Sequence, residues 1–244
     1  MVTPSTSASA APSAAASASP AATFTSDTVS VVFGGTSGIG RAVADALRAR
    51  PGRVIVAGRS TGLDIADPAA VEAFLAEIGP VDHVVVTAGS QAPGGPAAAL
   101  DLAAAKAAFD IKFWGAVAVA RAAAGRLRPG GTLTLTSGFL ARRATSGTFV
   151  KTAMNAAIEA GAKVLARELA PLRVNVVSPG LTDTEAYDGM APATRDAMLA
   201  KAAATLPAGR AGQPQDLAAG YLFVIDNPFV TGAVIDIEGG ALIQ

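Results

Sequence analysis

The 244-residue sequence contains no cysteine, which excludes disulfides, thiolate catalysis and cysteine-based zinc sites. Its one histidine, His83, precedes the apolar run VVV, so we expect it to be structural and expect no metal site. An excess of charge is also lacking, because 19 basic and 19 acidic residues cancel, and this argues against nucleic acid as the main ligand. No apolar run reaches the ~18 residues that span a bilayer. We therefore expect a soluble, cytoplasmic protein that has no membrane partner.

The N-terminal part of the sequence lacks the side chains that build a core. Residues 1–27 are almost entirely Ala, Ser, Pro and Thr, a composition typical of disorder. They also lack the basic segment and leucine-rich segment of a secretory signal. We predict a disordered extension over residues 1–27 and one folded domain over residues 28–244, for which a hydrophobic content of 51% in the whole chain is ample.

From residue 28 onward, short β-branched runs alternate with longer alanine-rich stretches. Six runs are predicted to be strands, namely VSVVFGG, VIVAG, HVVVTAG, GTLTLTSG, RVNVVSPG and GAVIDIEGG. The two longest helices are predicted over residues 102–127 and 149–169. This alternation indicates a single α/β domain, in which helices cover both faces of a doubly wound parallel sheet.

A glycine-rich loop joins the first strand to the first helix. Gly34, Gly38 and Gly40 permit a tight turn and a close approach of the backbone to a pyrophosphate at the helix N-terminus. The end of the second strand carries Arg59 and Ser60 in place of the acidic residue that holds the ribose of NAD. Since an arginine suits a 2′-phosphate, the sequence favours NADP over NAD.

Residues 28–244 resemble the short-chain dehydrogenase/reductase family. The resemblance rests on GGTSGIG, LDIAD, TAG, LTLTSG, NVVSPGLTDT and DIEGG, which occur in the family's order. It implies a Rossmann-type sheet of about seven strands and a homodimer or homotetramer formed through the two long helices. Ala153, Ala157 and Gly161 belong to a small-residue helix face that suits such close packing. The cofactor site implied by the resemblance comprises Gly34, Thr36, Ser37, Gly38, Ile39, Gly40, Arg59, Ser60, Asp64, Ile65, Ala88, Gly89, Pro179, Gly180, Thr182 and Thr184.

The resemblance also locates a catalytic set, and here the sequence departs from the family. The family uses a serine to orient the substrate carbonyl, a tyrosine to donate a proton, a lysine beside it and an asparagine on the preceding long helix. The serine carries over to Ser137. Lys151 stands at the tyrosine position, Asn155 at the lysine position and Lys112 at the asparagine position. Lys151 and Asn155 are four residues apart, so they share one helix face.

This exchange of a lysine with an amide favours a rearranged site over a lost one. Two lysines in one cleft lower each other's pKa, and a lysine with a lowered pKa can act as a general acid. We expect an NADP(H)-dependent oxidoreductase that interconverts a carbonyl and a hydroxyl on a small organic substrate. Ser137 would hold the carbonyl and Lys151 would deliver the proton, with Lys112 and Asn155 in support. Two alternatives stay open: an isomerase, aldolase or lyase that uses a lysine amine, and a non-catalytic dinucleotide-binding sensor.

A lid over the substrate is predicted at residues 185–207. Tyr187, Met190 and Met198 lie there among alanines, which indicates an apolar and adaptable pocket. Tyr187 is also an alternative source of a phenol proton. The identity of the substrate does not follow from these residues.

Overall fold

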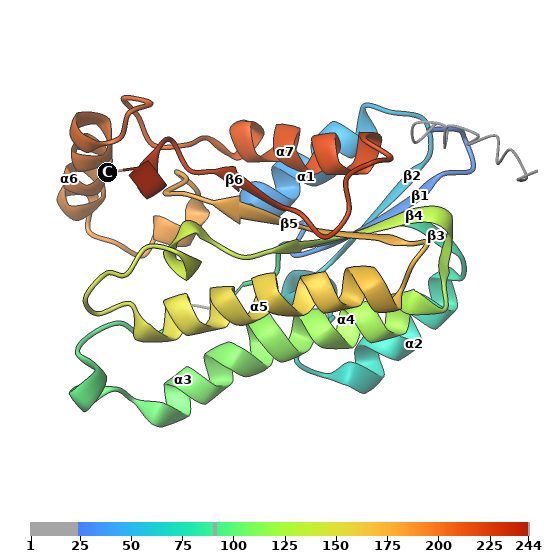
Figure 1. Ribbon diagram of the computed structural model, residues 1–244, viewed down its shortest axis with the longest axis horizontal. Helices are drawn as coiled ribbons and strands as arrows, with labels where there is room; N and C mark the ends of the chain where they lie inside the picture. Colours follow the sequence, from blue (N-terminus) through green and yellow to red (C-terminus); the bar gives the residue numbers. More distant parts are fainter. Residues whose placement is uncertain (1–23, 90–91, 244) are drawn as a thin grey trace, which may run out of the picture.

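The computed structural model describes residues 24–89 and 92–243, and these residues form a parallel sheet between two layers of helices (Figure 1). The strand order β2-β1-β3-β4-β5-β6 confirms the predicted α/β architecture and the six runs. The resemblance implied about seven strands, and the described residues contain six. Their bounds are Val29–Phe33 (β1), Arg53–Ala57 (β2), Val81–Val86 (β3), Leu127–Thr136 (β4), Arg173–Pro179 (β5) and Val234–Ile237 (β6).

The two layers of helices bury opposite faces of the strands. In β1, Val31 and Phe33 pack with one hydrophobic cluster, whereas Val32 between them packs with the other. This alternation follows from the two-residue period of a strand. One face is covered by α2 (Pro68–Ile78), α4 (Gly115–Ala124) and α5 (Phe149–Glu168), and the other by α1 (Gly38–Arg48) and α7 (Pro214–Asp226).

The first of the two predicted long helices is interrupted in its middle. It consists of α3 (Leu102–Phe109), a π-helical turn over Asp110–Trp114, and α4. The amide of Gly115 bonds to the carbonyl of Asp110, five residues earlier. Single π-helical turns occur frequently at functional sites because they redirect side chains. Lys112 lies within this turn. The helix ends at Ala124 rather than at residue 127.

The folded domain begins earlier than the sequence indicated. Phe24 stacks on His83 with ring centroids 5.0 Å apart, and the guanidinium of Arg50 lies 4.7 Å from the Phe24 ring centre. His83 is buried within β3 and bonds to Thr132, as a structural histidine does. Residues 24–27 therefore belong to the domain, while residues 1–23 of the predicted extension lie outside the described residues. Among the described helices, none has the length and hydropathy required to cross a membrane.

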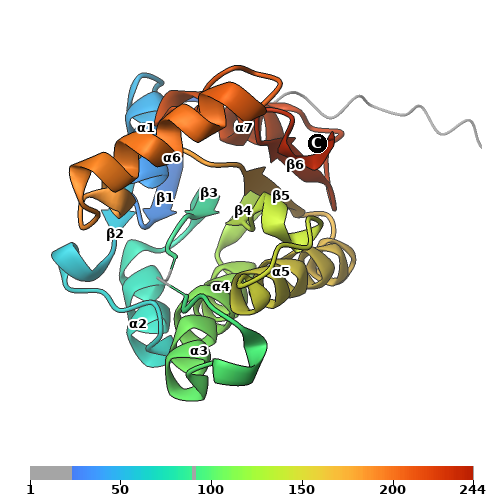
Figure 2. The same ribbon diagram turned by 90° about the vertical axis from the view of Figure 1, so that its left-hand side faces the viewer.

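The topology places the functional loops at one edge of the sheet. β1 lies between β2 and β3, so the chain reverses its direction of progress across the sheet next to β1. In open α/β sheets ligands bind outside the carboxyl ends of the strands at such a switch point. This edge faces the viewer in Figure 2, with α6 (Pro192–Thr205) on its upper side near α1.

Candidate active site

The loop that connects β1 to α1 contains glycines at which any other residue would force the backbone to move. Gly34 has a φ of +85°, and a Cβ at this position would lie 2.6 Å from the amide nitrogen of Ala88. A Cβ on Gly40 would lie 2.2 Å from the carbonyl oxygen of Gly34. Both contacts are with backbone atoms, which cannot rotate away. The loop is thus drawn tightly against the start of α1 and against the end of β3.

The first amide of α1 already binds an anionic group in this structure. The N–H of Gly38 donates to a carboxylate oxygen of Glu185 at 2.9 Å, and the other oxygen of Glu185 accepts from Arg41. The preceding residue, Ser37, provides no side-chain cap to the helix. The loop therefore fits a cofactor phosphate, because it presents an N-terminal helix amide to a negative oxygen.

The end of β2 presents the residues expected around an adenosine. Arg59 and Ser60 are exposed in a short 3-10 turn, and the guanidinium of Arg59 makes no hydrogen bond or ion pair with another described residue. Asp64 is exposed, and its carboxylate accepts from the amide of Ala66 at 2.9 Å. Ile65 is buried. The free guanidinium is suited to a 2′-phosphate.

The remaining residues of the expected cofactor site lie on the neighbouring strand ends. The amide of Ala88 donates to Phe33 in β1, so the strand end that precedes Gly89 is fixed against the phosphate loop. The amide of Gly180 donates to Ile237, and the Thr182 hydroxyl donates to the carbonyl oxygen of Gly180. Four segments at one edge of the sheet, at the ends of β1, β2, β3 and β5, thus include the expected residues Gly34, Thr36, Ser37, Gly38, Ile39, Gly40, Arg59, Ser60, Asp64, Ile65, Ala88, Gly89, Pro179, Gly180, Thr182 and Thr184.

Three of the four expected catalytic residues meet between α4, α5 and the end of β4. The ammonium group of Lys112 donates to Oδ1 of Asn155 at 2.6 Å and to the main-chain oxygen of Ser137 at 2.9 Å. Asn155 and Ser137 are buried, and Lys112 is half-buried. The exchanged lysine and amide are therefore direct partners in space. Lys112 extends from the π-helical turn, and its ammonium group reaches the side-chain amide of Asn155.

The pKa of Lys112 depends on its burial and on the neighbouring charge of Lys151. Burial, and next the positive charge of Lys151, lower the pKa of Lys112 from 10.5 to about 8. Lys151 is exposed one turn before Asn155, and it makes no hydrogen bond or ion pair with another described residue. Both acceptors of Lys112 are uncharged oxygens, so neither offsets its desolvation as a carboxylate would. Lys112 can therefore exchange a proton near neutral pH.

The hydroxyl of Ser137 points to a different partner from the one we expected. Its Oγ donates to Oε1 of the buried Glu159 at 2.8 Å, and Glu159 forms an ion pair with Arg142 at 3.1 Å. In contrast, a Cβ on Gly138 would lie 2.8 Å from Nδ2 of Asn155. Successive residues at the strand end project in opposite directions. The position that faces Asn155 is thus Gly138, which has no side chain. The carbonyl-holding role expected for Ser137 stays a prediction.

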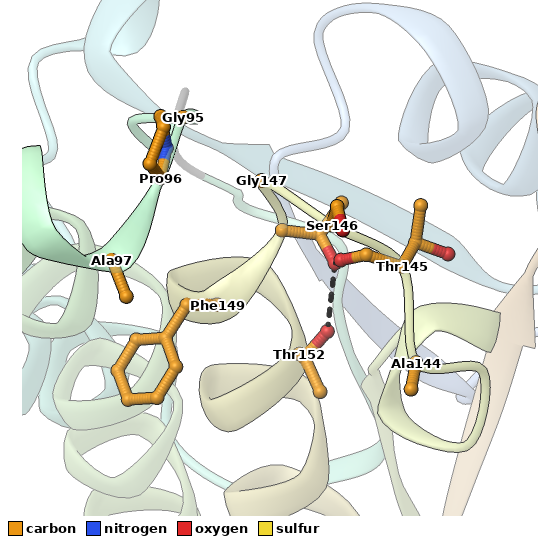
Figure 3. Close-up of a pocket in the computed structure, with 10 residues that line it drawn as sticks. Gly95, Pro96, Ala97, Ala144, Thr145, Ser146, Gly147, Phe149 and Thr152 are labelled. Carbon is orange, nitrogen blue, oxygen red and sulfur yellow. Dashed lines mark hydrogen bonds between the residues drawn. The ribbon is translucent and has the colours of Figure 1, made fainter.

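A cavity of about 710 Å³ opens at the start of α5 (Figure 3). Residues 95–97, residues 144–149 and Thr152 line it, and all of them are uncharged. The predicted lid contributes none of these residues, so the apolar pocket expected beside Tyr187, Met190 and Met198 is not this cavity. Burial and then Asp183 raise the pKa of Tyr187, which makes its phenol a poorer proton donor.

Glu159, Gly138 and Glu185 were not identified from the sequence. Glu159 lies four residues after Asn155, so helical spacing already places it on the same face. Gly138 follows Ser137 directly, and the alternation of a strand indicates that only one of the two can face the site. Glu185 gives no comparable signal, since its contact with Gly38 joins residues 147 positions apart.

Comparisons with known proteins show which family the chain resembles in sequence and fold. A protein-family model described as enoyl-(acyl carrier protein) reductase matches residues 60–241. A solved structure of a small-chain dehydrogenase in complex with NADPH is 53% identical, with a TM-score of 0.88, over 89% of this chain and 100% of that chain. A short chain dehydrogenase from Burkholderia cenocepacia J2315, solved in complex with NADP, is 27% identical, with a TM-score of 0.77, over 89% of this chain and 98% of that one. The short-chain dehydrogenase/reductase ucsE of Acremonium sp is 32% identical over 253 residues, which cover 87% of this chain and 94% of that protein.

Proposed function

Because this chain belongs to the short-chain dehydrogenase/reductase family and is an enzyme of that family, we propose that it interconverts a carbonyl and a hydroxyl on a small organic substrate with NADP(H). Cofactor preference is supported by the unpartnered guanidinium of Arg59 at the end of β2, where an acidic residue would oppose a 2′-phosphate. It is also supported by the NADPH complex of the 53% identical relative. Gly34, Gly38 and Gly40 would hold the pyrophosphate.

The observation that carries the proposal is the contact between Lys112 and Asn155. The resemblance implies a lysine at position 155. The contact puts an ammonium group beside this position, although the lysine that carries it belongs to another helical segment. The bound cofactor supplies the hydride. The protein must then deliver one proton to the carbonyl oxygen, and we assign this delivery to Lys151, one helical turn before Asn155. Lys112 keeps a positive charge beside the developing oxyanion, and Asn155 fixes the position of that charge.

The main-chain carbonyl of Ser137 also has a place in this scheme. Together with Asn155 it fixes the ammonium group of Lys112 from two sides. The Ser137 hydroxyl supports the site through Glu159 rather than by contact with the substrate. The catalytic set is therefore Lys151 and Lys112, with Asn155 and Ser137 as positioning residues.

The first test is a titration of the protein with NADPH and with NADH, followed by nicotinamide fluorescence, and then a panel of ketones and aldehydes with the better binder. We expect tighter binding of NADPH and consumption of at least one carbonyl compound. Lys151→Met should then lower turnover by about 100-fold or more, because a general acid contributes that much, while cofactor binding stays nearly unchanged. Lys163→Met, an exposed lysine of the same helix, is the matched control. Equal turnover in Lys151→Met and the control would remove Lys151 from the mechanism.

A second candidate function is favoured by the lowered pKa of Lys112. A lysine that is partly neutral near pH 8 can attack a carbonyl to form an imine, as isomerases, aldolases and lyases of this type do. Borohydride reduction in the presence of substrate would then attach the substrate covalently to Lys112 or Lys151. Hydride consumption without a covalent adduct would exclude this function. Cofactor binding without either reaction would instead indicate a dinucleotide sensor.

We also propose that the protein forms a homodimer or homotetramer through α4 and α5. Trp114, which precedes α4, is 57% exposed, and Phe149, the first residue of α5, is 62% exposed. A Cβ on Gly161 would meet no atom within 4 Å, so this face of α5 is open to close approach by another helix. Light scattering coupled to size-exclusion chromatography would measure the assembly.

A further inference from the structure

The strongest feature outside the catalytic set is the contact between Glu185 and the phosphate loop. Glu185 follows β5 and lies in a short 3-10 turn that leads to α6. Its two carboxylate oxygens bind different donors of α1: one accepts from the amide of Gly38 at 2.9 Å, and the other pairs with the guanidinium of Arg41. Residues 147 positions apart are thereby joined at the mouth of the cofactor site.

The carboxylate and a cofactor phosphate require the same donors. The phosphate loop directs a pyrophosphate to the N-terminus of α1, where the first free amide is that of Gly38. A side-chain carboxylate and a phosphate are both negative oxygen acceptors, and a single N–H cannot serve both at full strength. Binding of one therefore opposes binding of the other at this amide.

The loop that carries Glu185 is held in place from α6. Arg195 pairs with Asp183 at 2.7 Å and with Asp188 at 2.8 Å, on either side of Glu185. Thr184 lies against Gly38, since a Cβ on that glycine would be 3.5 Å from the Thr184 side chain. Movement of Glu185 away from α1 is thus coupled to the segment that includes α6.

We propose that Glu185 is an internal competitor of the cofactor, and that binding of the dinucleotide exchanges its carboxylate for a cofactor phosphate on Gly38 and Arg41. This inference rests on the proposed NADP(H) dependence. It makes Arg41 a further cofactor-binding residue, which gains a phosphate partner when it loses Glu185. Hydrogen bonds with backbone amides and with Arg41 lower the pKa of Glu185, so the competitor is fully ionised at neutral pH.

The test is the dissociation constant of NADPH and of NADH, measured by nicotinamide fluorescence and by calorimetry on the full chain. Glu185→Gln keeps the shape and removes the charge, and it should bind both cofactors about two- to fivefold more tightly, which is the range expected for one exposed charge at a helix N-terminus. Both cofactors should gain alike, because both carry the pyrophosphate. Arg41→Gln should weaken binding of both. Glu77→Gln, an exposed glutamate of α2, is the control for net charge and should change nothing.

The dissociation constants of the variants distinguish competition from the other roles that Glu185 could have. Equal or weaker binding in Glu185→Gln, with melting temperatures that show an intact fold, would overturn the competition. Weaker binding would in addition show that Glu185 stabilises the bound cofactor. A gain for NADPH alone would also overturn it, since the effect would then act on the 2′-phosphate. If the wild-type chain binds NADPH but turns over no carbonyl, the proposed reaction fails while the competition is still measured. If no variant binds either cofactor, the cofactor proposal fails, and this inference fails with it.

Discussion

The phosphate loop and the N-terminal half of α5 lie at the same edge of the sheet, yet they perform their tasks with different parts of the chain. The loop presents backbone amides, and its tight path requires the glycines of GGTSGIG. The candidate catalytic face presents side chains, and there the ammonium group of Lys112 contacts the side-chain amide of Asn155. The comparison teaches that a backbone site allows few alternative sequences, whereas a side-chain group can be supplied from another element that reaches the same point.

The largest expected effect tests the backbone side of this comparison. Gly40→Ala would place a Cβ 2.2 Å from the Gly34 carbonyl oxygen, and the loop must then open. NADPH binding should weaken by about 100-fold, equivalent to roughly 2.8 kcal/mol. Calorimetric titration measures the loss. Gly125→Ala is the control, because a Cβ there meets nothing within 4 Å, and it should leave binding unchanged. Binding by Gly40→Ala within threefold of wild type would show that the loop tolerates substitution and would remove the contrast.

The same contrast explains what the sequence could predict. The α/β class, the six strands and the glycine loop follow from local patterns of two-residue alternation, β-branching and turn glycines, and the structure confirms them. The partnership of Lys112 with Asn155 could be expected only by analogy, because it joins residues 43 positions apart through a π-helical turn that no local pattern announced. The direction of the Ser137 hydroxyl depends on the register of one strand end, which directs Gly138 rather than Ser137 toward Asn155. Side-chain chemistry is thus predicted less well because it depends on tertiary contacts.

A smaller effect is expected from introducing a negative charge at position 155, beside Lys112. Asn155→Asp would place a carboxylate beside the ammonium group of Lys112 and raise the pKa of that lysine by about one unit or more. In the wild type, carbonyl reduction should fall as the pH rises through about 8, where Lys112 loses its proton. The fall should move to higher pH in Asn155→Asp, as measured by turnover at saturating NADPH between pH 6 and 10. Ala76→Asp puts the same charge on an exposed turn of α2 and should not move the profile.

The lowered pKa of Lys112 also makes the stability of the protein depend on pH. The folded pKa of Lys112 is about 8 and its ordinary value is 10.5, so between these values the unfolded chain binds more protons than the folded chain. The free energy of unfolding should therefore increase as the pH rises across this window, so the folded protein becomes more stable. Urea unfolding at pH 8 and pH 10 measures it, and the gain should shrink in Asn155→Asp. A pH profile identical to wild type in that variant would mean that Lys112 does not govern the reaction.

The smallest effect is expected at Ser137, and it decides how the site is oriented. Ser137→Ala removes the hydroxyl that donates to Glu159, but Glu159 keeps its ion pair with Arg142. The variant should lose about 1–2 kcal/mol of stability, measured by urea unfolding, and its turnover should fall less than about tenfold. A hydroxyl that held the substrate carbonyl would instead contribute about 100-fold or more, as an oxyanion donor does. Gly138→Ser is the informative partner, since its side chain would begin 2.8 Å from Nδ2 of Asn155 and would face the lysines. A larger change in turnover in Gly138→Ser than in Ser137→Ala would show that this position faces the reacting carbonyl, and the reverse order would return Ser137 to the catalytic set.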